Sequence, residues 1–121
     1  MKSTLRAGMS HVGRIIVDRD RSVRDIEHAC RDLLREHTDP GEDSVGMEIA
    51  VRHTAPTLLG MGVDIAATVA AVDGRKIAFA ITAKDDVEPI ATGTHTRFVV
   101  DLKKTHQRLK VKASKRSAPV G

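Results

Sequence analysis

The sequence predicts an α+β fold, in which one helix packs against an antiparallel sheet of about five strands. Three observations predict it: one stretch with apolar residues at helical spacing, several stretches of alternating apolar and polar residues, and short turn signals between them. The predicted order is strand, helix and four further strands. Because tight hairpins join only antiparallel strands, the sheet is expected to be antiparallel, with the helix covering one face.

The first strand is expected over residues 9–17 and leads into a charged cluster at residues 18–21. A helix follows, because apolar residues then recur three and four positions apart, as on one face of an α-helix. These residues are Val23, Ile26, Cys30, Leu33 and Leu34. The Thr-Asp-Pro-Gly run at residues 38–41 is expected to end the helix.

Four strands are expected after residue 44. In the first, one face is predicted to carry Val45, Met47, Ile49 and Val51, with Gly46 and Glu48 on the other. The second strand covers residues 61–71 and leads to an Asp-Gly pair at residues 73–74, a strong hairpin signal. The third covers residues 77–83, and the fourth residues 94–102.

The bulk composition is that of a folded, single-domain protein. The chain has 121 residues, of which 40% are hydrophobic and 30% charged. Cys30 is the only cysteine, so neither an intramolecular disulfide nor a thiolate metal site is expected. No stretch has signal-peptide or bilayer-spanning character. These observations predict a cytoplasmic protein that does not span a membrane.

The positive charge is concentrated at the C-terminal end. The formal net charge is +4, yet residues 103–121 contain seven lysines and arginines and no acid, and the rest of the chain is slightly acidic. We therefore expect one domain over residues 1–102 and a basic tail over residues 103–121, a candidate for disorder because runs of like charge are commonly disordered. Three alternatives remain open for this tail: it binds the phosphates of coenzyme A, it binds nucleic acid, or it contacts only solvent.

Two side chains stand out as chemical candidates. Glu27 lies at the edge of the apolar stripe of the helix, where it is either a boundary residue that reaches water or a general base with a tuned pKa. His53 is two residues after Val51 in the same strand, so both side chains are predicted to point towards the helix. It is then either a core histidine or a residue that carries a proton. A His and a Glu that share one seam could activate a water molecule together.

Two further positions are candidates for substrate contacts. Gly46 follows the loop between helix and strand, where it is either a simple loop exit or a glycine that permits a backbone N–H to approach a substrate carbonyl. Arg97 lies on the face opposite Phe98, either as a solvated residue or as a charge that orients a ligand. Nucleotide-binding, zinc-protease and serine-hydrolase motifs are absent from the sequence, and the basic residues lack the interleaved aromatics of a single-strand nucleic-acid site.

Several segments together resemble the fluoroacetyl-CoA-specific thioesterase family of the hotdog fold. The most specific are the His-Thr-Ala-Pro-Thr run at residues 53–57 and the Gly-Thr-His-Thr-Arg run at residues 93–97. The Glu-His-Ala-Cys helix segment at residues 27–30 and the hairpin at residues 72–85 also match. The similarity extends from residue 27 to about residue 102.

The resemblance implies roles for four residues. Glu27 and His53 match the family's acyl-transfer Glu and His, whereas Gly46 and Arg97 match residues that line the acyl pocket. It also implies a homodimer or higher even oligomer. The implied substrate is an acyl-CoA, of which coenzyme A is a part, so no separate cofactor and no metal are expected. The family's threonine, eight residues before the Glu, is replaced by Arg19, because the segment before the helix Glu is shortened here.

Two functions remain open at this point. The first is an acyl-CoA thioesterase that releases a free acid and coenzyme A from a short or unidentified acyl group. The alternative is a non-catalytic hotdog module that binds acyl-CoA or a protein partner. A nucleic-acid partner is disfavoured.

Overall fold

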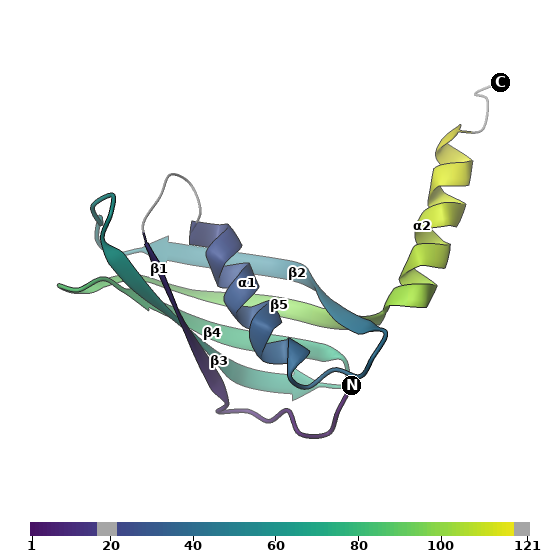
Figure 1. Ribbon diagram of the computed structural model, residues 1–121, viewed down its shortest axis with the longest axis horizontal. Helices are drawn as coiled ribbons and strands as arrows, with labels where there is room; N and C mark the ends of the chain where they lie inside the picture. The colour runs from purple at the N-terminus through teal and green to yellow at the C-terminus, as the bar shows by residue number, and fades with distance from the viewer. Residues whose placement is uncertain (17–21, 118–121) are drawn as a thin grey trace.

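A five-stranded sheet with one helix across its face forms the body of the molecule. The computed structural model describes residues 1–16 and 22–117, with the side chains of residues 22–24 left out. In Figure 1, helix α1 lies across the curved sheet and a second helix, α2, projects from one end of it. The predicted α+β architecture of one helix wrapped by an antiparallel sheet is confirmed.

The elements follow the predicted order, and all strand pairs are antiparallel. They are β1 (Ser10–Ile16), α1 (Ser22–Arg35), β2 (Glu42–His53), β3 (Gly62–Asp73), β4 (Lys76–Lys84), β5 (Pro89–Asp101) and α2 (Leu102–Ser117). In the sheet their order is β1-β3-β4-β5-β2, so β1 and β2 are the two edge strands. The long edge of β2 therefore has no strand beside it on one side.

Local sequence explains the β3–β4 connection. Gly74 has a φ of +58°, a left-handed conformation that glycine adopts without steric cost, and Asp73 pairs directly with Lys76 across the turn. The strong alternation of β3 and β4 then sends one set of side chains to the helix side. Val63, Ile65 and Val69 of β3 are buried there.

The core lies between α1 and the inner face of the sheet. Apolar residues of α1, including Ile26, Cys30, Leu33 and Leu34, pack against Phe79, Ile77, Ile81, Val99 and the inner residues of β3. Val23 belongs to the same predicted stripe, but its side chain lies outside the described set. The core contains one aromatic ring, that of Phe79, and is otherwise aliphatic, as the composition predicts.

A β-bulge in β2 changes which face its residues occupy. Gly46 pairs with Arg97 and Glu48 pairs with Thr96, so Met47 is an extra residue without a partner in β5. Before the bulge Ser44 and Gly46 face the helix, and after it Ile49, Val51 and His53 do. The prediction that Val45 and Met47 share the inner face is therefore wrong, and both are about half exposed.

The basic segment after β5 is helical. Helix α2 covers Leu102–Ser117, and its first turn is capped by Asp101, whose carboxylate accepts a hydrogen bond from the Lys104 backbone N–H at 3.0 Å. Nearly all of α2 is exposed. Residues 102–117 are thus helical, and the disorder for which their charge makes them a candidate stays a prediction.

A search of the described helices finds none that is both long enough and apolar enough to span a bilayer.

Candidate active site

Polar side chains gather on the inner face where β2 and β5 pair. Ser44 and Gly46 of β2 stand opposite Val99 and Arg97 of β5, and His95 lies two residues further along β5. His95 and Arg97 are only 1% and 5% exposed, although an imidazole and a guanidinium usually reach solvent. Polar groups buried this deeply need hydrogen-bond partners to offset their lost hydration.

The Arg97 guanidinium is held by three neutral groups. Its Nε donates to Ser44 Oγ at 2.7 Å, and Nη2 donates to the Ser44 carbonyl oxygen at 2.7 Å. Its Nη1 lies 3.3 Å from His95 Nε2. Burial lowers the pKa of Arg97 from its ordinary value, and nearby Cys30 and Glu27 oppose that effect.

Arg97 has no ion-pair partner among the residues that the structure describes. A guanidinium has five N–H donors, and the three contacts above use one each, so one donor on Nη1 and one on Nη2 remain. A buried cation with spare donors favours binding of an anionic or carbonyl oxygen. Its burial excludes the interpretation of Arg97 as a solvated surface residue, and its role as a ligand-orienting charge stays a prediction.

The position of the missing side chain at Gly46 lies between three functional groups. A Cβ atom built on Gly46 would lie 3.3 Å from His95 Cε1, 3.4 Å from Glu27 Oε1 and 3.7 Å from Arg97 Nη1. Glu27 of α1 thus reaches the Gly46–Arg97 pair. The structure brings three of the four predicted site residues to one place.

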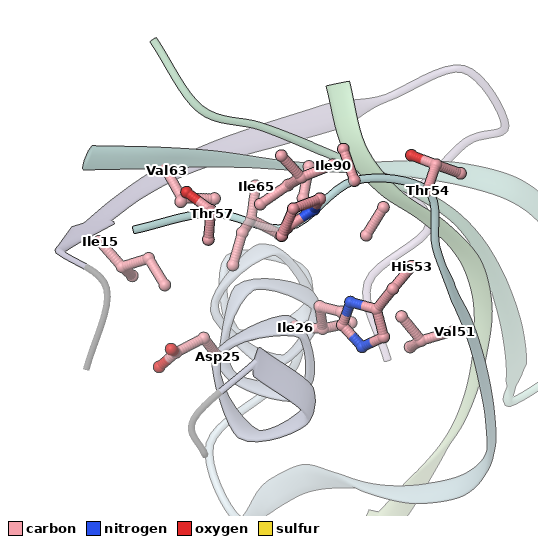
Figure 2. A pocket seen from close by; sticks show the side chains of 14 residues that line it. Ile15, Asp25, Ile26, Val51, His53, Thr54, Thr57, Val63, Ile65 and Ile90 are labelled. Atoms are coloured by element: carbon pink, nitrogen blue, oxygen red, sulfur yellow. The ribbon is translucent and has the colours of Figure 1, made fainter. Parts of the chain in front are cut away.

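The fourth predicted residue, His53, lies at the other end of β2 in a separate pocket. This pocket has a volume of about 480 Å³ and is lined by the first turns of α1, the end of β2, the following loop and inner residues of β3 to β5. Figure 2 shows the His53 ring beside Ile26 and Val51, with Asp25 and Thr57 at the rim. Its lining is mostly aliphatic, which suits an acyl chain or a pantetheine arm.

No hydrogen bond or ion pair joins Glu27 and His53 in the described part of one chain. The Glu27 carboxylate lies against Gly46, whereas His53 lines its pocket beside Asp25 and Ile26, the two residues that precede Glu27. Both side chains face the helix-sheet seam, but the predicted direct pair does not form within one chain.

Sequence reasoning missed two residues of the site, His95 and Ser44. The parity of β5 could have identified His95, since it alternates with outward-facing threonines and shares the face of Arg97 and Val99. Ser44 could not have been found, because its inward direction depends on the bulge that follows it.

Cys30 also lies beside the site, at the helix face near Glu27 and Arg97. Burial raises the pKa of its thiol to about 12, and Arg97 opposes this only in part. The thiol is therefore protonated at neutral pH and is not a nucleophile. Within residues 1–16 and 22–117, no group of three or more His, Cys, Asp or Glu side chains could hold a metal ion. Arg19, which replaces the family threonine, lies outside the described residues.

Known proteins resemble this chain in sequence and in fold. The family model of the fluoroacetyl-CoA-specific thioesterase FlK matches residues 20–103. A fluoroacetyl-CoA thioesterase of Streptantibioticus cattleyicolor is 37% identical over 87 residues, or 72% of this chain. The match spans only 63% of the length of that relative.

The solved structures agree on the architecture. A crystal structure of a single-residue variant of FlK superposes with a TM-score of 0.82 at 28% identity, covering 92% of this chain and 99% of the other. A thioesterase superfamily member from Thermus thermophilus has a TM-score of 0.90 at 18% identity, over 97% of this chain and 99% of its own, and supports the fold alone.

The chain is therefore a hotdog-fold protein of the thioesterase superfamily. It belongs to the fluoroacetyl-CoA-specific thioesterase family.

Proposed function

We propose that this protein is a thioester hydrolase that cleaves a short acyl-CoA to the free acid and coenzyme A. The observation that carries the proposal is the arrangement at Gly46, where the Glu27 carboxylate and the buried Arg97 guanidinium, with its two spare donors, face the position of the missing side chain. Family membership supports the reaction type. The family threonine is absent from its position, so fluoroacetyl specificity is not part of the proposal.

In the proposed reaction the thioester carbonyl lies against Gly46. The Glu27 carboxylate attacks the carbonyl carbon, or removes a proton from a water molecule that does so. The Gly46 backbone N–H and the free donors of Arg97 stabilise the negative charge that develops on the carbonyl oxygen. The thiolate of coenzyme A leaves, and His53 supplies its proton. Where Glu27 itself has attacked, a water molecule then hydrolyses the mixed anhydride on its carboxylate, which releases the free acid and restores Glu27.

We further propose that the protein works as a homodimer joined through β2. Strand β2 is a 12-residue edge strand with half-exposed Val45 and Met47, and a free edge of this length favours pairing with another strand. In an isologous antiparallel pair, the Gly46 end of one β2 lies beside the His53 end of the other. His53 of the second copy would then approach Glu27 of the first and complete the site.

The binding-module alternative has its own support, since a single chain separates Glu27 from His53. Substitution Glu27→Gln distinguishes the two functions in an assay of free coenzyme A release over a panel of acyl-CoA thioesters. We expect the rate to fall by about 100-fold or more, since Gln preserves shape but removes the base. A wild-type protein that binds acyl-CoA and releases no coenzyme A from any thioester would establish the binding module.

Complementation tests the shared site. Glu27→Gln and His53→Ala chains are each expected to be inactive, and a mixed dimer contains one site with both wild-type residues. Mixing the two after unfolding and refolding should therefore restore about a quarter of the wild-type rate. Mass spectrometry would show whether mixed dimers have formed. If they have and no activity returns, both residues act in a site within one chain.

The lone Cys30, a buried free thiol, suits a reducing compartment, so a cytoplasmic location is part of the proposal.

A further inference from the structure

Helix α2 is a strongly basic element that the proposed reaction does not use. Its 16 residues contain no acid and seven basic side chains, namely Lys103, Lys104, Arg108, Lys110, Lys112, Lys115 and Arg116. The helix leaves the end of β5 and extends past the open edge of β2 (Figure 1). A helix with this charge and so little contact with the body favours an anionic partner.

The base of α2 forms one wall of a groove. Lys104 and Arg108 line it together with Arg75 of the β3–β4 turn and Phe98 of β5, and its volume is about 260 Å³. Arg75 donates to Glu42 at 2.8 Å. Across the described part of the chain, neither Lys104 nor Arg108 has an ion-pair partner. The groove therefore combines two cations, the Asp101 carboxylate that caps α2, and a Phe98 side chain that is 38% exposed.

Helical spacing divides the basic residues between two sides of α2. Lys104, Arg108 and Lys112 follow one another at four-residue intervals and form a row that starts at the groove. Lys103 and Lys110 lie roughly a third of a turn or more away from this row. They provide the same charge on a side that does not line the groove.

The groove lies at the same end of the sheet as the proposed reaction site, but Phe98 points to the opposite face from Arg97. Helix α2 begins five residues after Arg97, about 15 Å along the strand, and the pantetheine arm would pass around this end of the sheet to reach the groove. An acyl-CoA carries its phosphates and adenine at the far end of the pantetheine arm, so they must bind away from the thioester. This spacing suits that separation.

We infer that the groove and the Lys104–Arg108 row bind the adenosine 3′,5′-bisphosphate end of the coenzyme A substrate. The inference rests on the proposed function. Lys104 and Arg108 pair with the phosphates, and the exposed Phe98 ring provides a stacking surface for adenine. A membrane surface fits less well, since Leu109 and Val111 lie on opposite sides of α2 and give it no broad apolar face.

Two double substitutions that remove equal charge test the inference. Lys104→Gln with Arg108→Gln is compared with Lys103→Gln and Lys110→Gln as the matched control. For an acyl-CoA, the first pair should raise KM by about 10-fold with kcat unchanged, and the control should change it far less. For the same acyl group on pantetheine, which lacks the nucleotide, KM should not change in either variant.

Calorimetry with adenosine 3′,5′-bisphosphate provides a readout that needs no catalysis. The groove variant should lose about 10-fold in affinity relative to the control. If wild-type protein hydrolyses no thioester but this difference in affinity is found, the proposed function fails and the binding site stands. Equal affinities in the two variants, an equal rise in KM for the pantetheine thioester, or tighter binding of a DNA oligonucleotide than of the bisphosphate would each overturn the inference.

Discussion

His95 Nδ1 lies 2.7 Å from the backbone carbonyl oxygen of Glu48, the residue that directly follows the bulge in β2. A carbonyl oxygen only accepts, so Nδ1 carries a proton and donates it. In the neutral ring Nε2 then has a free lone pair, which accepts a hydrogen bond from Arg97 Nη1 at 3.3 Å. His95 therefore connects the bulge to the guanidinium and fixes the direction of both.

Two amide substitutions at His95 separate its two contacts. Asn places a donor near the position of Nδ1 and keeps the contact with the Glu48 carbonyl, whereas Gln places an acceptor near Nε2 and keeps the contact with Arg97. We expect His95→Asn to lower kcat/KM by about 10-fold or more and His95→Gln to lower it only a few-fold. Steady-state kinetics on the best acyl-CoA substrate would measure this.

The two His95 variants should rank in the opposite order by stability, with His95→Gln less stable than His95→Asn. His95→Gln leaves the buried Glu48 carbonyl without its partner, at a cost of about 1–3 kcal/mol in the free energy of unfolding, and His95→Asn should cost less. Urea denaturation measures both. If the two variants lose activity and stability in parallel, His95 acts only as a packing residue.

The pH dependence of stability should contain a contribution from His95. Burial lowers the pKa of His95 below its ordinary value of 6.5, with Arg97 adding to this and Glu27 opposing it. The unfolded chain then binds a proton at higher pH than the folded chain, so the free energy of unfolding falls as pH decreases below about 6.5. Comparing wild type with His95→Gln from pH 7.5 to 5.5 isolates the effect, because the variant should lose less stability on acidification.

Gly46→Ala tests the space at the centre of the site. The added methyl group would come within 3.4 Å of Glu27 Oε1 and His95 Cε1, where the thioester carbonyl is expected to bind. We expect kcat/KM to fall by about 100-fold with a stability loss of about 1 kcal/mol or less. Gly13→Ala is a suitable control, because its new methyl group meets only His11 Nε2 at 3.9 Å.

The thiol of Cys30 should be inert in the folded protein. It is fully buried and its pKa is raised to about 12, so almost no thiolate exists at pH 8. Iodoacetamide should therefore modify Cys30 only in denaturant, as followed by intact mass spectrometry. Rapid modification of native protein at pH 8 would show that the region around Cys30, Glu27 and Arg97 opens to solvent.

The sequence pattern was sufficient for the α+β architecture because its signals are local, whereas the hotdog fold followed from the family resemblance. The helical spacing from Ile26 to Leu34, the Asp73-Gly74 turn and the alternation in β3 to β5 each act over a few residues, and each corresponds to an element of the structure. The register of β2 was not predictable in this way. Nothing in the residues around Met47 marks it as unpaired, and one extra residue exchanges the two faces of the strand.

The candidate site was predicted in part for the same reason. Glu27, Gly46 and Arg97 come together as expected, whereas the partnership of Glu27 with His53 depends on distance along β2, which spacing on separate elements does not give. His95 shares the parity of Arg97 and Val99, but parity indicates only burial and does not show which groups the ring contacts. Its role depends on Glu48, 47 residues away in the chain.

The unpaired Met47 also sets a limit on protein engineering. A regular ladder that kept Met47 and paired it with β5 would have more complete hydrogen bonding. It would shift the residues upstream by one position against β5, so that Ser44 and Gly46 would leave the helix side and Val45 and Met47 would take their place. In such a regular strand the side chains of Val45 and Met47 would replace the Ser44 hydroxyl and Gly46 on the helix side. Arg97 would then lose its two hydrogen bonds to Ser44 and keep only the contact with His95.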